Sequence, residues 1–133
     1  MKGETDLSIL LATMRPVLHD EAYVFCVVDQ ETYRKLPFLP LCTFREREGI
    51  TAIVTRQQAE AYRLPFDSLW AYIELAVHSS LSAVGFLAVI SNRLAAAGIS
   101  TNVISACYHD HLFVPWESRK QAVDILKELS LSQ

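Results

Sequence analysis

The sequence predicts an α+β fold in which helices pack on one face of antiparallel strands. Two similar tripeptides, Ala22-Tyr23-Val24 and Ala71-Tyr72-Ile73, each open an apolar run rich in β-branched and aromatic residues. After each run the chain shows the same order of helix, hairpin and helix, with a period of about half the chain. Two copies of strand, helix, strand, strand, helix are typical of a layered α+β arrangement.

Each element of the first half has a local signal. Asp6 or Ser8 is suited to cap a first helix, which Pro16 limits. Pro37 and Pro40 leave room for only one helical turn before them, and Glu48-Gly49 is typical of a hairpin turn. The strands expected in this half cover residues 23–28, 42–47 and 50–54, and the helices expected after the first one cover residues 32–36 and 56–63.

The second half repeats this order with a longer first helix. Residues 69–77 predict a strand, residues 82–97 a helix and residues 99–106 a second strand, followed by a turn near His109-Asp110 and a last helix from Trp116. Gly98 is expected to end the long helix in the left-handed conformation. That helix has apolar residues on more than one stripe, which predicts broad burial and favours a homo-oligomer. Both halves together predict two ferredoxin-like modules.

Composition excludes several classes of function. The chain has 133 residues, is 51% hydrophobic and 20% charged, and carries a net charge of −3, with no basic block. Such a chain is expected to fold as one domain or two small modules and to bind no nucleic acid. The apolar run at residues 9–12 is too short for a signal sequence or membrane span. Three cysteines, an odd number in apolar or strand-like surroundings, predict free buried thiols in the cytoplasm.

The loop before the long helix of the second half is a candidate anion site. Helix N-termini expose unpaired amides that suit carboxylates, so residues 79–82 are a plausible ligand contact. Ser79 and Ser80 can equally cap the helix with no ligand present. Gly85 permits either close ligand approach or tight packing of the helix on the sheet. The amide of Asn102 is as suited to a structural hydrogen bond as to a ligand contact.

One other cluster raises the question of chemistry. Cys107, His109 and His111 alternate along a strand, and thiolate with imidazole can bind zinc. The expected turn breaks this alternation, and no fourth ligand has a suitable spacing. Nothing in the sequence orients a Cys-His pair for nucleophilic catalysis. We therefore expect no metal, no cofactor and no catalytic residue, and we expect Asp110 to bond its own backbone as a turn residue.

The segment AYIELAVHSSLSAVGFLAVISNRLAAAGISTNVISACYHDHLFVP, residues 71–115, resembles the second module of tandem ACT-domain proteins, in particular short bacterial ones of unassigned function. The first half, through EGITAIV and the following helix, resembles the degenerate first module of the same proteins. The eukaryotic cytosolic arginine sensors contain a similar module. The resemblance implies a division into residues 1–65, an N-terminal helix plus a degenerate module, and residues 66–133, an ACT domain.

This resemblance implies a non-enzymatic regulatory protein that binds a small effector, usually an amino acid, where a module meets its neighbour. The effector would contact the loop after the module's first strand, the start of its first helix and the second strand. The implied ligand-binding residues are His78, Ser79, Ser80, Leu81, Ala83, Val84, Gly85, Asn102, Val103 and Ile104. Many ACT modules have an Asp-Arg-Pro-Gly type loop where this chain has His78-Ser79-Ser80-Leu81. The alternatives are an interaction or oligomerisation module without a small ligand, and a small zinc or Cys-His enzyme.

Overall fold

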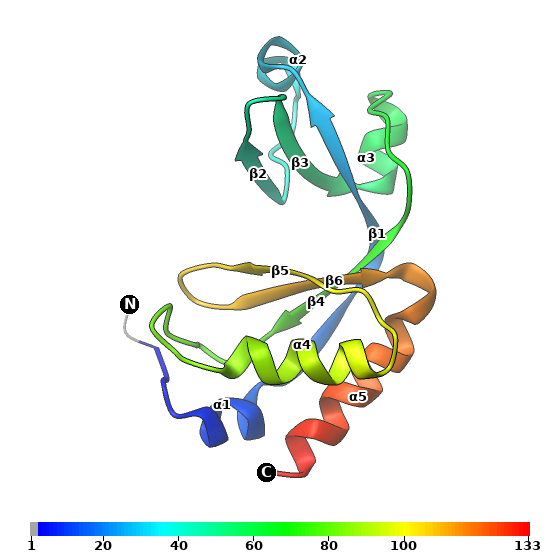
Figure 1. Ribbon diagram of the computed structural model, residues 1–133. Coiled ribbons are helices and arrows are strands. Elements are labelled where there is room, and N and C mark those ends of the chain that lie inside the picture. The colour runs from blue at the N-terminus through cyan, green and yellow to red at the C-terminus, as the bar shows by residue number, and fades with distance from the viewer. Residues whose placement is uncertain (1–2) are drawn as a thin grey trace. The chain divides into compact units, whose positions relative to one another are not determined.

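The computed structural model describes residues 3–133 and shows the predicted repeat (Figure 1). The elements are α1 Leu7–Thr13, β1 Pro16–Val28, α2 Gln30–Lys35, β2 Cys42–Arg45, β3 Ile50–Thr55, α3 Arg56–Ala61, β4 Trp70–Leu75, α4 Phe86–Ala96, β5 Asn102–Ser105, β6 Asp110–Pro115, the 3₁₀ helix η1 Trp116–Ser118 and α5 Arg119–Leu131. The runs β1-α2-β2-β3-α3 and β4-α4-β5-β6-α5 have the same order, as the two halves of the sequence predict.

The strands are antiparallel and follow the hydrogen-bonded order β2-β3-β1-β4-β6-β5. The predicted α+β class is confirmed, although the strands join in one sheet rather than in one sheet per module. The chain divides into two compact units, one made of the residues up to Asp20 together with Ala71–Gln133, and one made of Glu21–Trp70. Strand β1 contributes to both units, and the proposed boundary between residues 65 and 66 stays a prediction.

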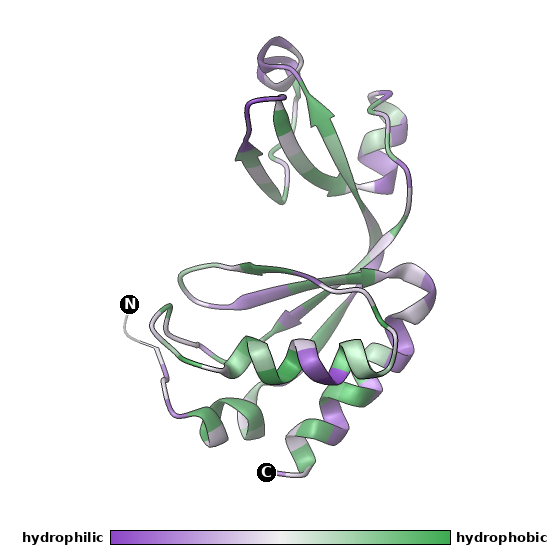
Figure 2. Ribbon diagram, in the orientation of Figure 1, coloured by the Kyte–Doolittle hydropathy of each residue, from purple (hydrophilic) through white to green (hydrophobic). Residues whose placement is uncertain are grey.

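The larger unit has its core between its strands and the helices α1, α4 and α5, which lie on one face of these strands (Figure 1). Figure 2 shows apolar stretches in each of these helices. The side chain of Asp6 caps α1 by accepting a hydrogen bond from the Ile9 amide at 3.0 Å. The buried residues of this core are Leu10, Leu11, Met14, Ala71, Ile73, Leu75, Phe86, Ile90, Leu94, Ile99, Leu112, Val114, Ala122, Leu126 and Leu129.

The smaller unit has a separate and smaller core. Alternate residues of β1 and β3 supply most of it, with Ala59 of α3 and Leu64 after that helix. A capping box between Thr55 and Gln58 begins α3, and Asp29 caps α2. Hydrogen bonds from Thr32 hold the pKa of Asp29 below its usual value. The buried residues are Val24, Cys26, Val28, Ala52, Val54, Ala59 and Leu64.

Several element boundaries differ from the predictions, and three of these differences have a local explanation. Strand β1 begins at Pro16 rather than at Tyr23, because the polar residues 19–21 interrupt the apolar pattern between Leu18 and Ala22. Strand β5 covers only Asn102–Ser105, because the chain turns from Ala106 to His109. Helix α4 begins at Phe86 rather than Ser82, since Gly85 adopts the left-handed conformation with φ of 90°. The predicted helix stop at Gly98 is confirmed by its φ of 74°.

The thiols and the helix lengths test two further expectations. Cys26 is buried and Cys42 half-buried, but Cys107 is exposed in the β5–β6 turn, so the expectation of three buried thiols is wrong for that residue. None of the described helices is long and apolar enough to cross a membrane.

Candidate functional site

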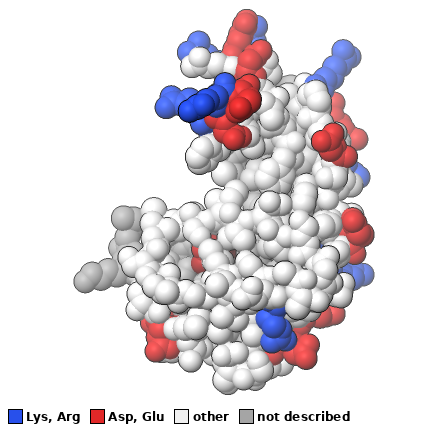
Figure 3. Space-filling model, viewed as in Figure 1, with Lys and Arg blue, Asp and Glu red and all other residues white. Residues whose placement is uncertain are grey.

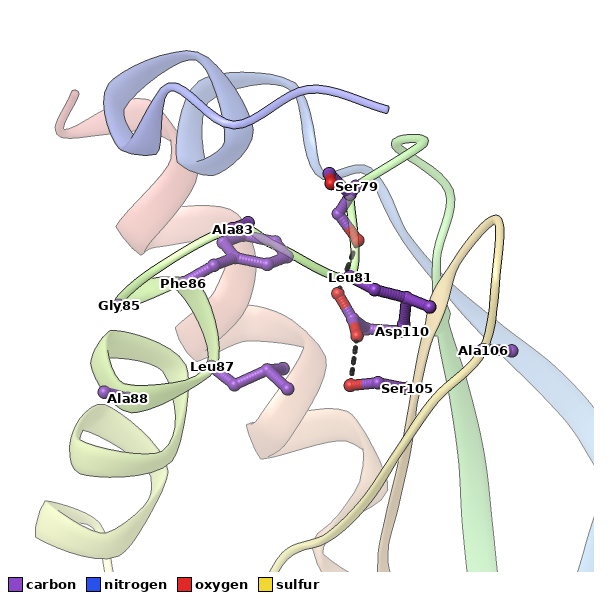
Figure 4. A pocket seen from close by; sticks show the side chains of 11 residues that line it. Ser79, Leu81, Ala83, Gly85, Phe86, Leu87, Ala88, Ser105, Ala106 and Asp110 are labelled. Atoms are coloured by element: carbon purple, nitrogen blue, oxygen red, sulfur yellow. Dashed lines mark hydrogen bonds between the residues drawn. The ribbon is translucent and has the colours of Figure 1, made fainter. Parts of the chain in front are cut away.

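A pocket of about 180 Å³ lies in the larger unit, next to the N-terminal turn of α4. The loop after β4, the first turn of α4 and the β5–β6 hairpin provide its walls (Figure 4). Its lining residues are Ser79, Ser80, Leu81, Ala83, Gly85, Phe86, Leu87, Ala88, Ser105, Ala106 and Asp110. Seven of these eleven residues are apolar, and the polar side chains come from three serines and one aspartate.

Asp110 is the charged group of the pocket, and its side chain is only 6% exposed. One carboxylate oxygen accepts a hydrogen bond from the Ser79 hydroxyl at 2.6 Å, and the other accepts one from the Ser105 hydroxyl at 2.7 Å (Figure 4). The expectation that Asp110 bonds its own backbone in a turn is wrong. The turn closes one residue earlier, where the Ala106 amide donates to the His109 carbonyl, and Asp110 already belongs to β6 opposite Ser105.

The carboxylate of Asp110 forms no ion pair within residues 3–133. The pocket lining contains no Lys, Arg or His, and the surface over the β5–β6 hairpin shows few basic side chains in Figure 3. A buried carboxylate is costly unless a cation compensates it, and two hydroxyl donors occupy only part of its capacity to accept hydrogen bonds. The pocket therefore presents an anionic group with room for a cationic ligand group.

The N-terminus of α4 is the second polar feature of the pocket. Its N-cap is Gly85, and no side chain caps the first turn within the described residues. The first amides of a helix have no partner inside the helix, and they lie at the positive end of its dipole. Gly85, Phe86, Leu87 and Ala88 all line the pocket. A carboxylate is the group best suited to this end.

The serines do not cap α4, which corrects one interpretation of the sequence. Ser79 donates to Asp110, while Ser80 accepts from the amides of Ser82 and Ala83 and so shapes a turn before the helix. Gly85 is not inside the helix and is not explained by helix packing, because a Cβ there would meet only the Leu7 side chain, at 3.7 Å. Its left-handed backbone instead separates the turn from the helix.

The structure brings together half of the residues that the resemblance implies. Ser79, Ser80, Leu81, Ala83 and Gly85 line the pocket. The His78 ring lies 5.0 Å from the Tyr108 ring, and its Nε2 is buried without a hydrogen-bond partner among the described residues. Val84 is exposed.

The implied residues of β5 do not line the pocket. Val103 packs against the core of the larger unit, while Asn102 and Ile104 oppose Phe113 and His111 and so share the other face of the strands. Sequence reasoning missed Ser105 and Asp110, which lie opposite each other. Their signal was the alternation of Asp110, Leu112 and Val114, which places the carboxylate on the core side of β6.

The candidate metal cluster does not form. Within residues 3–133 no group of three metal-ligating side chains comes together, and Cys107 is exposed in the turn. His111 instead bonds Tyr72, with 2.6 Å between its Nδ1 and the tyrosine hydroxyl, and the Tyr72 ring stacks on His19 at 4.1 Å. His19 in turn lies 3.4 Å from Glu74. These side chains lie on the face of the strands opposite to α4.

Acidification is expected to destabilise the protein through His111. Burial lowers the pKa of His111 below its usual value of 6.5, against a smaller raising effect of Glu74; His109 and His19 also lower it, and Asp110 raises it. The unfolded chain therefore binds more protons than the native one as pH falls from about 6.5 through the lower native pKa. In this range the free energy of unfolding should decrease as the pH is lowered. Urea denaturation at several pH values should show that the free energy of unfolding depends less on pH in His111→Gln than in the native protein. An unchanged pH dependence would show that His111 is not the group responsible. His109→Gln, in the neighbouring turn, is the matched comparison.

The fold and the pocket define a class: a small α+β protein of two repeated modules with a ligand-sized cavity beside a helix N-terminus. Residues 2–71 match one ACT-domain family model, and residues 68–128 match a second ACT-domain model. The chain thus belongs to the ACT-domain family, with two ACT modules in tandem. Together the two matches span residues 2–128, and no separate catalytic domain is evident in the described part of the chain.

Solved structures agree with this assignment. A protein of unknown function from Vibrio cholerae is 41% identical, with a TM-score of 0.81 over 93% of this chain and 95% of that one. The regulatory subunit of aspartate kinase from Thermus thermophilus, in its ligand-free form, is 12% identical, with a TM-score of 0.69 over 89% and 97% of the two chains. A protein from Agrobacterium tumefaciens has a TM-score of 0.67 at 14% identity, over 86% and 87%. At these low identities the last two show a common fold alone. Among curated proteins, none matches this chain.

Proposed function

We propose that this protein is a non-enzymatic regulator that binds a small neutral amino acid in the pocket beside α4. Its main support is the buried Asp110 carboxylate, which has no cation among the described residues and lies in the same pocket as the uncapped end of α4. An amino acid carries both complementary groups. Its ammonium would bind Asp110, and its carboxylate would bind the first amides of α4.

The rest of the lining favours a ligand with an uncharged side chain. Leu81, Ala83, Phe86 and Leu87 provide apolar walls, and the lining has no Lys, Arg or His. A second carboxylate on the ligand would lie in a pocket with no basic partner and near the charge of Asp110. A second ammonium would compete for one carboxylate. In both cases a charged group of the ligand would lose its hydration without gaining an opposite charge in the pocket.

Regulation would follow from the position of the pocket at the surface of α4 and its loop. Leu81 is 65% exposed and Val84 is 84% exposed, so the loop that builds the pocket also presents apolar side chains to a partner. A ligand shifts an association equilibrium only by its different affinity for the two states. We propose that the ligand changes the conformation of this loop and thereby the assembly of a homo-oligomer. The exposed free thiol of Cys107 suits the reducing cytoplasm.

A thermal-shift screen of the twenty amino acids tests the proposal. We expect a neutral amino acid to raise the melting temperature, because binding stabilises the native state by about 2.7 kcal/mol at a hundredfold excess over Kd. Calorimetry with the same ligand then gives the affinity. If none of the twenty raises the melting temperature or releases heat, the proposed function is wrong.

A second candidate function is an interaction module with no small ligand. The exposed Leu81 and Val84 favour it, because both apolar side chains come from the same loop, and an exposed apolar patch is typical of a contact surface. This function predicts a flat screen together with concentration-dependent self-association in sedimentation velocity. Replacing both residues by Ser would then abolish the association.

A further inference from the structure

The N-terminal segment of the described chain pairs with the loop that builds the pocket. The Glu4 amide donates to the His78 carbonyl at 2.8 Å, and the Ser80 amide donates to the Glu4 carbonyl at 3.0 Å. Together these bonds make a parallel bridge between Glu4 and Ser79. The residue between the two bonded positions of the loop, Ser79, is the residue whose hydroxyl bonds Asp110.

Gly3 approaches the same loop more closely than any other residue type allows. A Cβ at this position would lie 2.6 Å from the Ser80 nitrogen, 2.7 Å from the Ser79 carbonyl carbon and 2.9 Å from the His78 oxygen. All three atoms belong to the backbone, so a side chain could not be accommodated by a rotamer change. Even alanine would force the two segments apart.

The other end of this segment is fixed to the core. The Glu4 side chain accepts hydrogen bonds from the amides of Thr5 and Asp6, both at 2.9 Å, and Asp6 caps α1. Helix α1 in turn buries Leu10 completely in the core of the larger unit. Residues 3–4 therefore connect a helix held in the core to a loop on the wall of the pocket.

We propose that residues 3–4 form a strap that holds the 78–80 loop in place and so positions the Ser79 hydroxyl and the Asp110 carboxylate for the ligand. This inference rests on the proposed function. Gly3 and Glu4 touch no ligand in this scheme and act as positioning residues through the loop. Linkage also requires the reverse effect: a ligand that needs the held loop must strengthen the pairing of the strap.

The test is Gly3→Ala, with Thr5→Ala as the matched control because Thr5 is exposed and lies two residues away. Amide exchange by NMR on the free protein is the first readout. We expect the Ser80 amide to exchange at least tenfold faster in Gly3→Ala, with the core amides of α5 unchanged. Calorimetry with the amino acid from the screen is the second readout, and we expect about tenfold weaker binding, the equivalent of one or two lost hydrogen bonds. Ligand should slow Ser80 exchange in the native protein.

The possible results separate this inference from the proposed function. Faster Ser80 exchange with unchanged affinity would overturn the positioning role and leave the proposed function intact. Unchanged exchange at Ser80 would show that residues 3–4 do not hold the loop, whatever binds. If no amino acid binds the native protein, the proposed function fails, and with it the positioning role of the strap for this ligand. A Gly3→Ala protein with fast exchange throughout α5 has lost its fold. Glu4→Pro then replaces it, since proline removes the amide donated to His78, together with the side chain that accepts from Thr5 and Asp6.

Discussion

Replacing Asp110 by Asn is expected to weaken amino-acid binding about ten- to hundredfold while leaving the free protein at least as stable as before. A hydrogen bond to a charged group contributes about 1.5–3 kcal/mol, and each 1.4 kcal/mol is a factor of ten in affinity. Asparagine has nearly the same shape, and the Ser79 and Ser105 hydroxyls can rotate to donate to it or accept from it. The variant therefore removes the charge and keeps the packing.

The free energy of unfolding gives this prediction its second half. The carboxylate of Asp110, a residue that is 6% exposed, has two hydroxyl donors and no cation among the described residues, so it is costly to bury. A purely structural aspartate would lower stability when neutralised, whereas a ligand-binding one in this setting should not. Calorimetry measures the affinity, and urea denaturation without ligand measures the stability.

Asp124→Asn is the matched control, because Asp124 is exposed on α5 and gives the same change in net charge. It should alter neither quantity. If Asp110→Asn binds the amino acid with full affinity, the Asp110 carboxylate does not contact the ligand. A large loss of stability with unchanged affinity would assign Asp110 to the structure of the hairpin alone.

Replacing Leu10 by Ala is expected to destabilise the protein by about 2–5 kcal/mol, the range for a leucine that leaves a cavity in a packed core. Leu10 is fully buried in the larger core although α1 lies outside the repeated strand-helix order. Helix α1 packs mainly against α5, and the Ser130 hydroxyl donates to the Ala12 carbonyl at 2.9 Å. The short helix is therefore part of the core and not an appendage.

Its neighbour Ile9 provides the control, because the side chain is 48% exposed on the same helix. Ile9→Ala should change the free energy of unfolding by no more than about 0.5 kcal/mol. Urea denaturation of the two variants at one pH gives the comparison. Equal small losses for both would mean that α1 is detached from the core in solution.

Much of the fold could be predicted because its signals are local. Glu48-Gly49 between two alternating strands predicts the β2–β3 hairpin, and the structure places Arg45 opposite Ile50 across that turn. Gly98 ends α4 because glycine readily adopts the left-handed backbone conformation. The repeat of strand, helix, hairpin and helix also follows from element order alone. These features need no knowledge of which residues meet across the fold.

The site could be predicted only in part, because its polar contacts join residues far apart in sequence. The Ser79 hydroxyl donates its hydrogen bond to Asp110, 31 residues away. Ser79 therefore does not cap α4, although serine is favoured at helix N-termini. Once that hydroxyl is bound, the helix begins after the left-handed Gly85 instead. The strap is a non-local backbone contact between Glu4 and the loop, and no sequence pattern predicts it.

The exposed Cys107 makes the pocket chemically addressable. Burial raises the pKa of the Cys26 and Cys42 thiols, which lowers the reactive thiolate fraction at both positions, and Cys26 is also shielded by its surroundings. Cys107 is open to reagents, and it directly follows Ala106, which lines the pocket. A maleimide dye should thus attach at the tip of the β5–β6 hairpin without mutagenesis, where its emission would report the occupancy of the neighbouring cavity.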